Sequence, residues 1–133
     1  MIQIVKDADT RPWFFLQTAH TTYGMRVMET GHLEHLYYGE RITVDSQDPA
    51  SCAPLVIQRA FAPGNTCTYD REHPQISMED VCLEVGTLGK GDIREPFLEV
   101  RFADGSVTSD FTFDSYKIIT LKEREQCLQD SGL

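Results

Sequence analysis

Residues 21–38 read TTYGMRVMETGHLEHLYY, and apolar and polar side chains alternate on both sides of Thr30-Gly31. In the run Thr21–Glu29 one face carries Tyr23, Met25 and Val27, and a similar alternation resumes over His32–Tyr38. Alternation with a period of two is typical of a β-strand with one buried face. Two such runs joined by a short glycine-containing turn predict an antiparallel hairpin.

A second hairpin is predicted further along the chain, where Phe97–Phe102 and Val107–Phe113 flank Asp104-Gly105. Asp-Gly favours a type I′ turn, which needs positive φ at both central residues. Shorter runs at Trp13–Gln17 and Tyr116–Leu121 predict two more strands.

The stretch between the hairpins, from about Asp45 to Glu95, is irregular and rich in proline. Within it, Leu55–Gln58 and Val81–Val85 are expected to form short strands or turns, and a helix is expected only in the tail, Lys122–Gln129. The whole pattern predicts an all-β fold of antiparallel hairpins, with a β-sandwich favoured over a closed barrel. With 133 residues, the chain is expected to form a single domain over residues 1–133.

The net charge of −9 disfavours several classes of partner. Nucleic acids and anionic membrane surfaces both require clustered Lys and Arg, so neither is expected. A neutral ligand such as a sugar remains compatible with the charge. No basic segment followed by a long apolar run opens the chain, so we expect a cytoplasmic protein with reduced thiols at its four cysteines, Cys52, Cys67, Cys82 and Cys127.

Catalytic and metal-binding motifs are not evident in the sequence. His32 and His35 lie three apart on a predicted strand, so they point to opposite faces and do not suggest a metal site. Pairs of carboxylates such as Asp92 with Glu95, or Glu79 with Asp80, lie in polar loops where solvation is the simpler expectation. We therefore predict no catalytic residues, no metal and no cofactor. Among the aromatic residues, Phe61 and Tyr69 stand out because they lie in the irregular stretch, where they pack locally or bind a sugar.

Several motifs resemble, in order, the opening of glycoside hydrolase family 36 α-galactosidases. They are Thr22-Tyr23, Gly31–Gly39 (GHLEHLYYG), Arg59–Pro63 (RAFAP), Ser77-Met78-Glu79, Glu84, Gly89–Pro96 (GKGDIREP), Asp104-Gly105-Ser106 and Ser115–Ile118 (SYKI). The similarity runs from about Thr18 to Ile119. It departs from the family at Gln58, where some relatives have Asp, and at Val85-Gly86, which replaces Tyr-Pro.

The resemblance implies a galactose-mutarotase-like β-supersandwich, of which this chain would be an N-terminal fragment without the catalytic barrel. It implies a non-catalytic part of a retaining enzyme that hydrolyses terminal α-galactosides of the melibiose and raffinose type, with homo-oligomer contacts. It also implies that Gln58, Arg59 and Phe61 belong to a loop that lines the substrate pocket of a neighbouring subunit. A free-standing β-sandwich module that binds carbohydrate or another protein is the alternative function.

Overall fold

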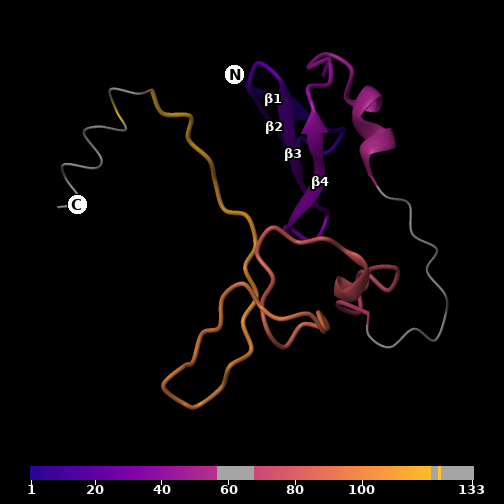
Figure 1. Cartoon of the computed structure of the whole chain (residues 1–133). Coiled ribbons are helices and arrows are strands. Elements are labelled where there is room, and N and C mark those ends of the chain that lie inside the picture. Colours follow the sequence, from indigo (N-terminus) through magenta and orange to yellow (C-terminus); the bar gives the residue numbers. More distant parts are fainter. Residues whose placement is uncertain (57–67, 121–122, 124–133) are drawn as a thin grey trace.

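In the computed structural model, which describes residues 1–56, 68–120 and 123, the chain begins with an antiparallel sheet (Figure 1). Its four strands follow one another in space in the order β1-β2-β3-β4. They are β1 (Ile2–Lys6), β2 (Pro12–Gln17), β3 (Thr21–Val27) and β4 (Leu33–Glu40). The β3–β4 hairpin and the strand at Trp13–Gln17 are confirmed, whereas β1 was not predicted.

A glycine in β3 makes room for an aromatic ring of β2. Gly24 lies opposite Phe15 of β2, and the β3–β4 register shifts between Gly24 and Met25. A Cβ atom on Gly24 would lie 3.1 Å from Cε1 of Phe15. The missing side chain therefore makes room for the aromatic ring on the buried face of the sheet.

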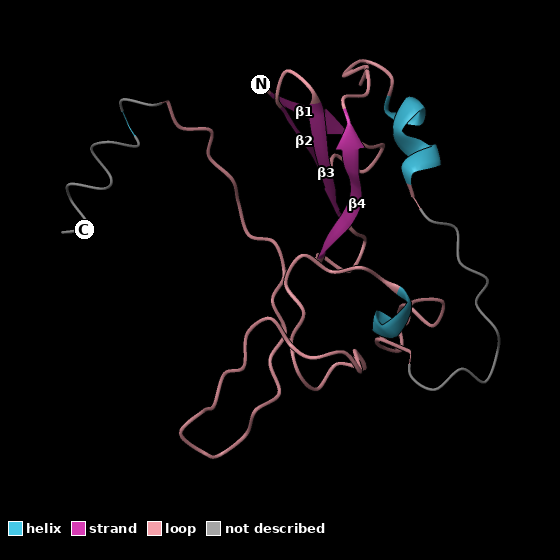
Figure 2. Cartoon of the chain, viewed as in Figure 1, coloured by secondary structure: helices cyan, strands magenta, loops and turns pink. Residues whose placement is uncertain are grey.

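One face of the sheet carries the main hydrophobic core. Its buried members are Val5, Trp13, Phe15, Leu36, Val44 and Cys52. The 3-10 helix η1 (Pro49–Leu55) follows β4 (Figure 2). It contributes Cys52 to this core, with Leu55 and Val56 packed against it. Asp48 stabilises the start of η1, because its carboxylate accepts a hydrogen bond from the backbone N–H of Ala50 at 3.1 Å.

A second, smaller core involves the β3–β4 turn. It contains Met28, Ile76, Met78 and Val81, and the short 3-10 helix η2 (Met78–Asp80) supplies one of these residues. On the face of the sheet opposite the main core, the ring of Phe14 contacts the rings of Phe113 and Tyr116, with centroids 5.9 and 5.1 Å apart. The chain after residue 109 thus partly covers that face.

The all-β antiparallel class is confirmed, but the strands predicted at Phe97–Phe102, Val107–Phe113 and Tyr116–Leu121 are wrong for the described residues. The first two segments make isolated backbone hydrogen bonds, through the N–H groups of Phe97, Phe102, Ser109 and Phe113, without a ladder. On the apolar face of the first segment, Leu98 is 43% exposed and Phe102 is 47% exposed, so this face is only partly covered. Val81–Val85, where a short strand or turn was expected, contributes a single bridge, from Leu83 to Glu34 of β4.

The turn at Asp104-Gly105 exists in a different form from the predicted one. The N–H of Gly105 donates to the carbonyl of Phe102 at 2.9 Å, and the N–H of Phe102 donates to the carbonyl of Ser106 at 2.9 Å. Gly105 has φ of 86°, whereas Asp104 is not among the residues with positive φ. The connection is therefore a three-residue loop that ends in a left-handed glycine, rather than a type I′ turn.

We expect Gly105→Val to lower the free energy of unfolding by about 1–2 kcal/mol, because a β-branched residue is strained at positive φ. No atom lies within 4 Å of the Cβ position, so the cost comes from the backbone alone. Urea denaturation followed by circular dichroism measures it. Ser106→Ala is the control and should cost much less; equal losses for the two variants would contradict the turn.

Candidate functional site

The residues predicted to contact substrate, Gln58, Arg59 and Phe61, lie outside the described residues. The structure does describe the chain on both sides of them. On the N-terminal side, Leu55 and Val56 pack against the main core. On the C-terminal side, Tyr69 packs against the second core. Both flanks of the predicted loop are therefore fixed to the folded part of the chain.

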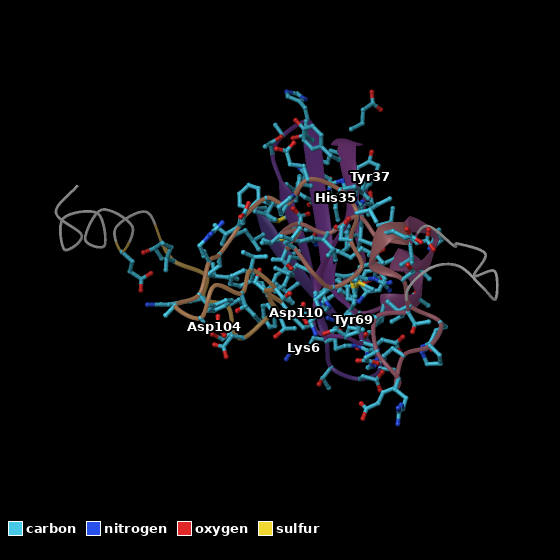
Figure 3. The ribbon with its side chains drawn as sticks, turned by 90° about the horizontal axis from the view of Figure 1, so that it is seen from below. Lys6, His35, Tyr37, Tyr69, Asp104 and Asp110 are labelled. Atoms are coloured by element: carbon cyan, nitrogen blue, oxygen red, sulfur yellow. The ribbon has the colours of Figure 1, made fainter. Side chains whose placement is uncertain are left out.

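Tyr69 belongs to a polar cluster centred on Asp110. The hydroxyl of Tyr69 donates to Oδ2 of Asp110 at 2.6 Å, and Nε2 of His32 lies 2.6 Å from Oδ1 of the same carboxylate. The other ring nitrogen of His32 lies 2.8 Å from Oγ1 of Thr30. Figure 3 shows Asp110 and Tyr69 as neighbours, although they are far apart in sequence. The carboxylate thus joins the β3–β4 turn to the segment that follows the predicted loop.

Aromatic and cationic contacts complete this cluster. The rings of Tyr69 and His32 meet edge to face at 5.0 Å, and Nζ of Lys90 lies 5.6 Å from the centre of the Tyr69 ring. Burial and the hydrogen bond to Asp110 raise the pKa of Tyr69 to about 12. Tyr69 therefore remains a hydrogen-bond donor at neutral pH, a role that suits structural support.

A second cluster lies on the opposite face of the sheet from the main core. The hydroxyl of Tyr23 donates to Oε2 of Glu84 at 2.5 Å, and Nδ1 of His35 lies 3.1 Å from Oε1. Burial, followed by the bond to Glu84, raises the pKa of Tyr23 to about 12. The N–H of Glu84 also donates to the carbonyl of Leu33 at 2.9 Å, so the segment is fixed against the edge of β4.

Asp92 and Arg94, which belong to the motif Gly89–Pro96, form a third group with a structural role. Nε of Arg94 donates to Oδ1 of Asp92 at 2.8 Å, and Nη2 donates to the carbonyls of Met78 and Val81. The guanidinium therefore satisfies carbonyl groups around η2 while Asp92 holds it in place. Burial alone would raise the pKa of Asp92, but the hydrogen bonds and charge of Arg94 outweigh it, and the pKa is lowered.

This pKa shift predicts a pH dependence of stability. A carboxyl with a lowered pKa in the folded state stabilises the protein above its unfolded pKa, about 3.9 for Asp, and loses that contribution as pH falls through the folded value. We expect Asp92→Asn to unfold more easily at neutral pH and to lose less further stability between about pH 5 and pH 2. Urea midpoints measured across this range provide the test. Asp114→Asn is the exposed control, and a wild-type acid dependence in Asp92→Asn would contradict the ion pair's role.

The carboxyl groups with shifted pKa values, Asp7, Asp70, Asp92, Asp104 and Glu123, are all shifted downward because hydrogen bonds favour the charged form. A general acid at neutral pH needs the opposite shift. In the described part of the chain, no group of three or more His, Cys, Asp or Glu side chains could hold a metal ion.

Sequence reasoning missed the roles of Asp110, Lys90 and His32. Asp110 lies in a predicted strand and Lys90 in a glycine-rich loop, and neither neighbourhood carries a local signal. His32 was assigned as an ordinary strand residue, although its side chain is only 3% exposed. A buried histidine needs partners for its ring nitrogens, and that requirement was the one available clue.

Among the described residues, no helix is long and apolar enough to cross a membrane.

Comparison with known proteins identifies relatives of this chain. Residues 31–130 match the family model described as the glycosyl hydrolase family 36 N-terminal domain. The bifunctional alpha-galactosidase/sucrose kinase AgaSK of Mediterraneibacter gnavus is 35% identical over 116 residues, which are 86% of this chain and 12% of that protein. Alpha-galactosidase AgaA of Geobacillus stearothermophilus is 29% identical over 111 residues, or 84% of this chain and 14% of that protein.

Solved structures show the same relationship. The crystal structure of the alpha-galactosidase from Lactobacillus brevis matches with a TM-score of 0.69 and 32% identity, covering 85% of this chain and 14% of that one. The galactosidase domain of AgaSK matches with a TM-score of 0.64 and 28% identity, covering 86% of this chain and 15% of that one. The chain thus spans about one-seventh of these proteins, and it belongs to the glycosyl hydrolase family 36 N-terminal domain family.

Proposed function

We propose that residues 1–133 serve as the single, non-catalytic N-terminal β-sandwich domain of a retaining α-galactosidase. The parent enzyme would hydrolyse terminal α-galactosides of the melibiose and raffinose type. The observation that carries the proposal is the match of residues 31–130 to the family's N-terminal domain. A retaining glycosidase needs two carboxyl groups about 5–5.5 Å apart, one of them with a raised pKa, and these would come from the remainder of the enzyme.

The domain would support the enzyme by presenting the loop that contains Gln58, Arg59 and Phe61. Its flanks are held by the main core at Leu55 and by the Asp110 cluster at Tyr69. Anchors of this kind reduce the conformational freedom lost when a loop closes on a ligand. In an oligomer, the loop would form one wall of the active site of a neighbouring subunit.

Oligomer contacts are part of the same proposal, and an exposed apolar surface supports them. A cavity of about 310 Å³ lies beside Phe14, and its lining includes Ile2, Leu16, Tyr116 and Ile118. These four side chains are all exposed. Contiguous apolar surface of this kind marks sites of protein association.

We place the protein in the cytoplasm, as the free thiols of Cys52 and Cys82 would favour.

The expected result for the isolated chain is that it does not hydrolyse a chromogenic α-galactoside. Purification from a host that lacks α-galactosidase makes the assay decisive, and measurable turnover would contradict the non-catalytic role. Sequencing the gene past codon 133 tests the parent directly. A reading frame that continues into a barrel-encoding region supports the proposal, whereas a stop codon favours a free-standing carbohydrate-binding or protein-interaction module.

A further inference from the structure

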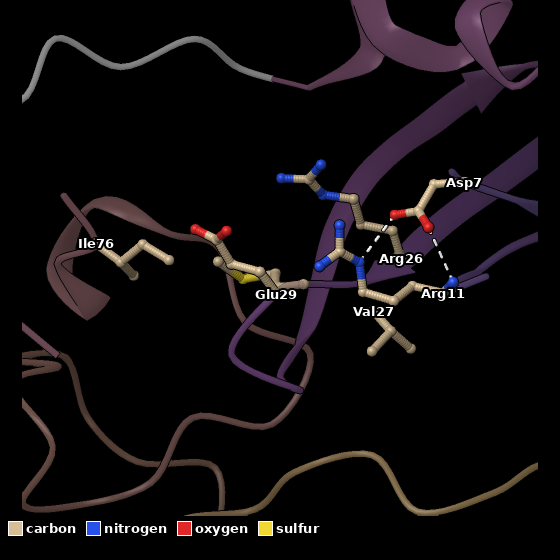
Figure 4. Close-up of a pocket in the computed structure, with 7 residues that line it drawn as sticks. Asp7, Arg11, Arg26, Val27, Glu29 and Ile76 are labelled. Carbon is tan, nitrogen blue, oxygen red and sulfur yellow. Dashed lines mark hydrogen bonds and ion pairs between the residues drawn. The ribbon is translucent and has the colours of Figure 1, made fainter. Parts of the chain in front are cut away.

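A cavity of about 300 Å³ opens at the end of the sheet where the β1–β2 and β3–β4 turns lie (Figure 4). The volume is at the lower end of the range for small-molecule sites, which runs from about 300 to 1,000 Å³. The lining residues are Asp7, Arg11, Arg26, Val27, Met28, Glu29 and Ile76. This cavity is separate from the Asp110 cluster and uses none of its residues.

The first arginine of the cavity is held in place by the β1–β2 turn. Oδ1 of Asp7 accepts the backbone N–H groups of Asp9 and Arg11, each at 2.9 Å, so the carboxylate shapes the turn. Oδ2 of Asp7 accepts Nε of Arg11 at 2.9 Å, and Asp9 accepts Nη2 at 2.6 Å. The hydrogen bond to Asp7 raises the pKa of Arg11. Its guanidinium is therefore oriented before any ligand arrives.

The second arginine is fixed from the sheet. Nε of Arg26 donates to Oε2 of Glu34 at 2.7 Å, and the guanidinium lies 5.3 Å from the centre of the Trp13 ring. Glu34 is buried on the neighbouring strand. Figure 4 shows both guanidinium groups directed into the same space, with Glu29 and Ile76 on its far side.

The far side of the cavity offers the complementary chemistry. Glu29 is exposed, and its Oε1 accepts a hydrogen bond from Nε2 of Gln75 at 3.0 Å, which steadies the carboxylate. Val27, Met28 and Ile76 add apolar surface between the charged groups. The cavity thus combines fixed donors, a carboxylate acceptor and apolar patches.

Charge balance limits the class of ligand. The two arginines are accompanied by the carboxylates of Asp7, Asp9, Glu34 and Glu29, and the whole chain carries a net charge of −9. An anion would therefore be repelled. A neutral polyhydroxylated ring matches the cavity, because adjacent hydroxyl groups both donate and accept, and the C–H face of the ring is apolar. We propose that this cavity is a binding site for a neutral saccharide, separate from the loop at Gln58, Arg59 and Phe61.

Titration of the ¹⁵N-labelled chain with galactose, followed by NMR, tests this site. We expect saturable shifts of the backbone amides of Asp9, Arg11 and Val27–Glu29. Glucose tests selectivity among neutral hexoses, and binding of either sugar there supports the site. Galacturonate carries a carboxylate on the same ring and should bind more weakly. Absence of saturable shifts at these amides with both neutral sugars, or tighter binding of galacturonate, would overturn the proposal.

Three variants locate the binding. Glu29→Ala removes the acceptor without touching the β1–β2 turn, and Arg11→Gln removes the charged donor; each should weaken binding on the order of tenfold, as loss of a hydrogen bond to a charged group does. Arg41→Gln is the matched control, because Arg41 lines another cavity, of about 270 Å³, and should bind as wild type does. Unchanged affinity in a folded Glu29→Ala variant would overturn the assignment. The result of this binding test does not depend on the proposed role of the chain as a domain of an α-galactosidase, which is tested separately by the reading frame past codon 133.

Discussion

Replacing Phe15 with alanine is expected to lower the free energy of unfolding by about 4 kcal/mol, within the range for deletion of a buried phenylalanine ring. Phe15 is 0% exposed and lies in the main core with Trp13 and Leu36. Its ring also fills the space over Gly24, whose Cβ position is only 3.1 Å away. Because the surrounding strands are hydrogen-bonded into a sheet, they cannot close the resulting cavity, and the full cost remains.

Leu16→Ala is the matched control for this variant. Leu16 is the next residue of β2, points to the other face of the sheet and is 40% exposed. We expect it to cost less than about 1.5 kcal/mol, because 40% of Leu16 is already in contact with water and its truncation removes less buried apolar area. Urea denaturation curves of the two variants provide the comparison. Similar losses would mean that the buried and open faces of the sheet have been assigned the wrong way round.

The second large effect is expected from Asp110→Ala, which should destabilise the fold by about 3 kcal/mol. The substitution leaves Nε2 of His32 and the hydroxyl of Tyr69 without their acceptor. His32 is buried, so water cannot replace the lost carboxylate at low cost. The segment after the predicted loop also loses a connection to the β3–β4 turn.

Asp114→Ala separates this effect from the general loss of a carboxylate. Asp114 is exposed, and its carboxylate accepts a hydrogen bond from the hydroxyl of the adjacent Ser115 at 3.0 Å. We expect a change below about 0.5 kcal/mol for it. Thermal unfolding by differential scanning calorimetry measures both variants. Equal melting temperatures would show that the Asp110 cluster contributes little to stability.

The β3–β4 hairpin could be predicted because its information is local. Alternation over Thr21–Glu29 and His32–Tyr38 sets the faces, and Thr30-Gly31 sets the reversal, with Gly31 at φ of 84°. A local pattern of this kind does not depend on distant parts of the chain. β1 is harder to predict in this way, because alternation in Ile2–Lys6 breaks at the adjacent apolar pair Ile4 and Val5, and the buried residue is Val5.

Phe97–Phe102 and Val107–Phe113 show the limit of the method. Their alternation is as regular as that of β3, but a strand needs a hydrogen-bonded neighbour, and within the described residues these segments have none beyond isolated bonds. The alternation of apolar and polar residues shows which side of a segment is apolar. Whether a ladder forms depends on what lies beside it, which the sequence of the segment does not contain.

The candidate site was harder to predict for a related reason. Asp110 is separated by 78 residues from His32 and by 41 residues from Tyr69. No periodicity or motif connects positions so far apart, so the cluster emerges only from the fold. The resemblance to the family identified Asp92 and Arg94 by motif, and the structure adds the physical role of holding the carbonyls around η2.

The order of the strands in the sheet, β1-β2-β3-β4, equals their order along the chain, and each pairs with the next in antiparallel register. No strand pairing in the first forty residues requires a long loop to close. The contacts of this region are therefore close in sequence, and a low contact order of this kind favours fast folding. During synthesis, each strand leaves the ribosome with its partner already available or following at once. The sheet can assemble cotranslationally and then serve as a template for the segments that follow, which have no ladder of their own over residues 41–56 and 68–120.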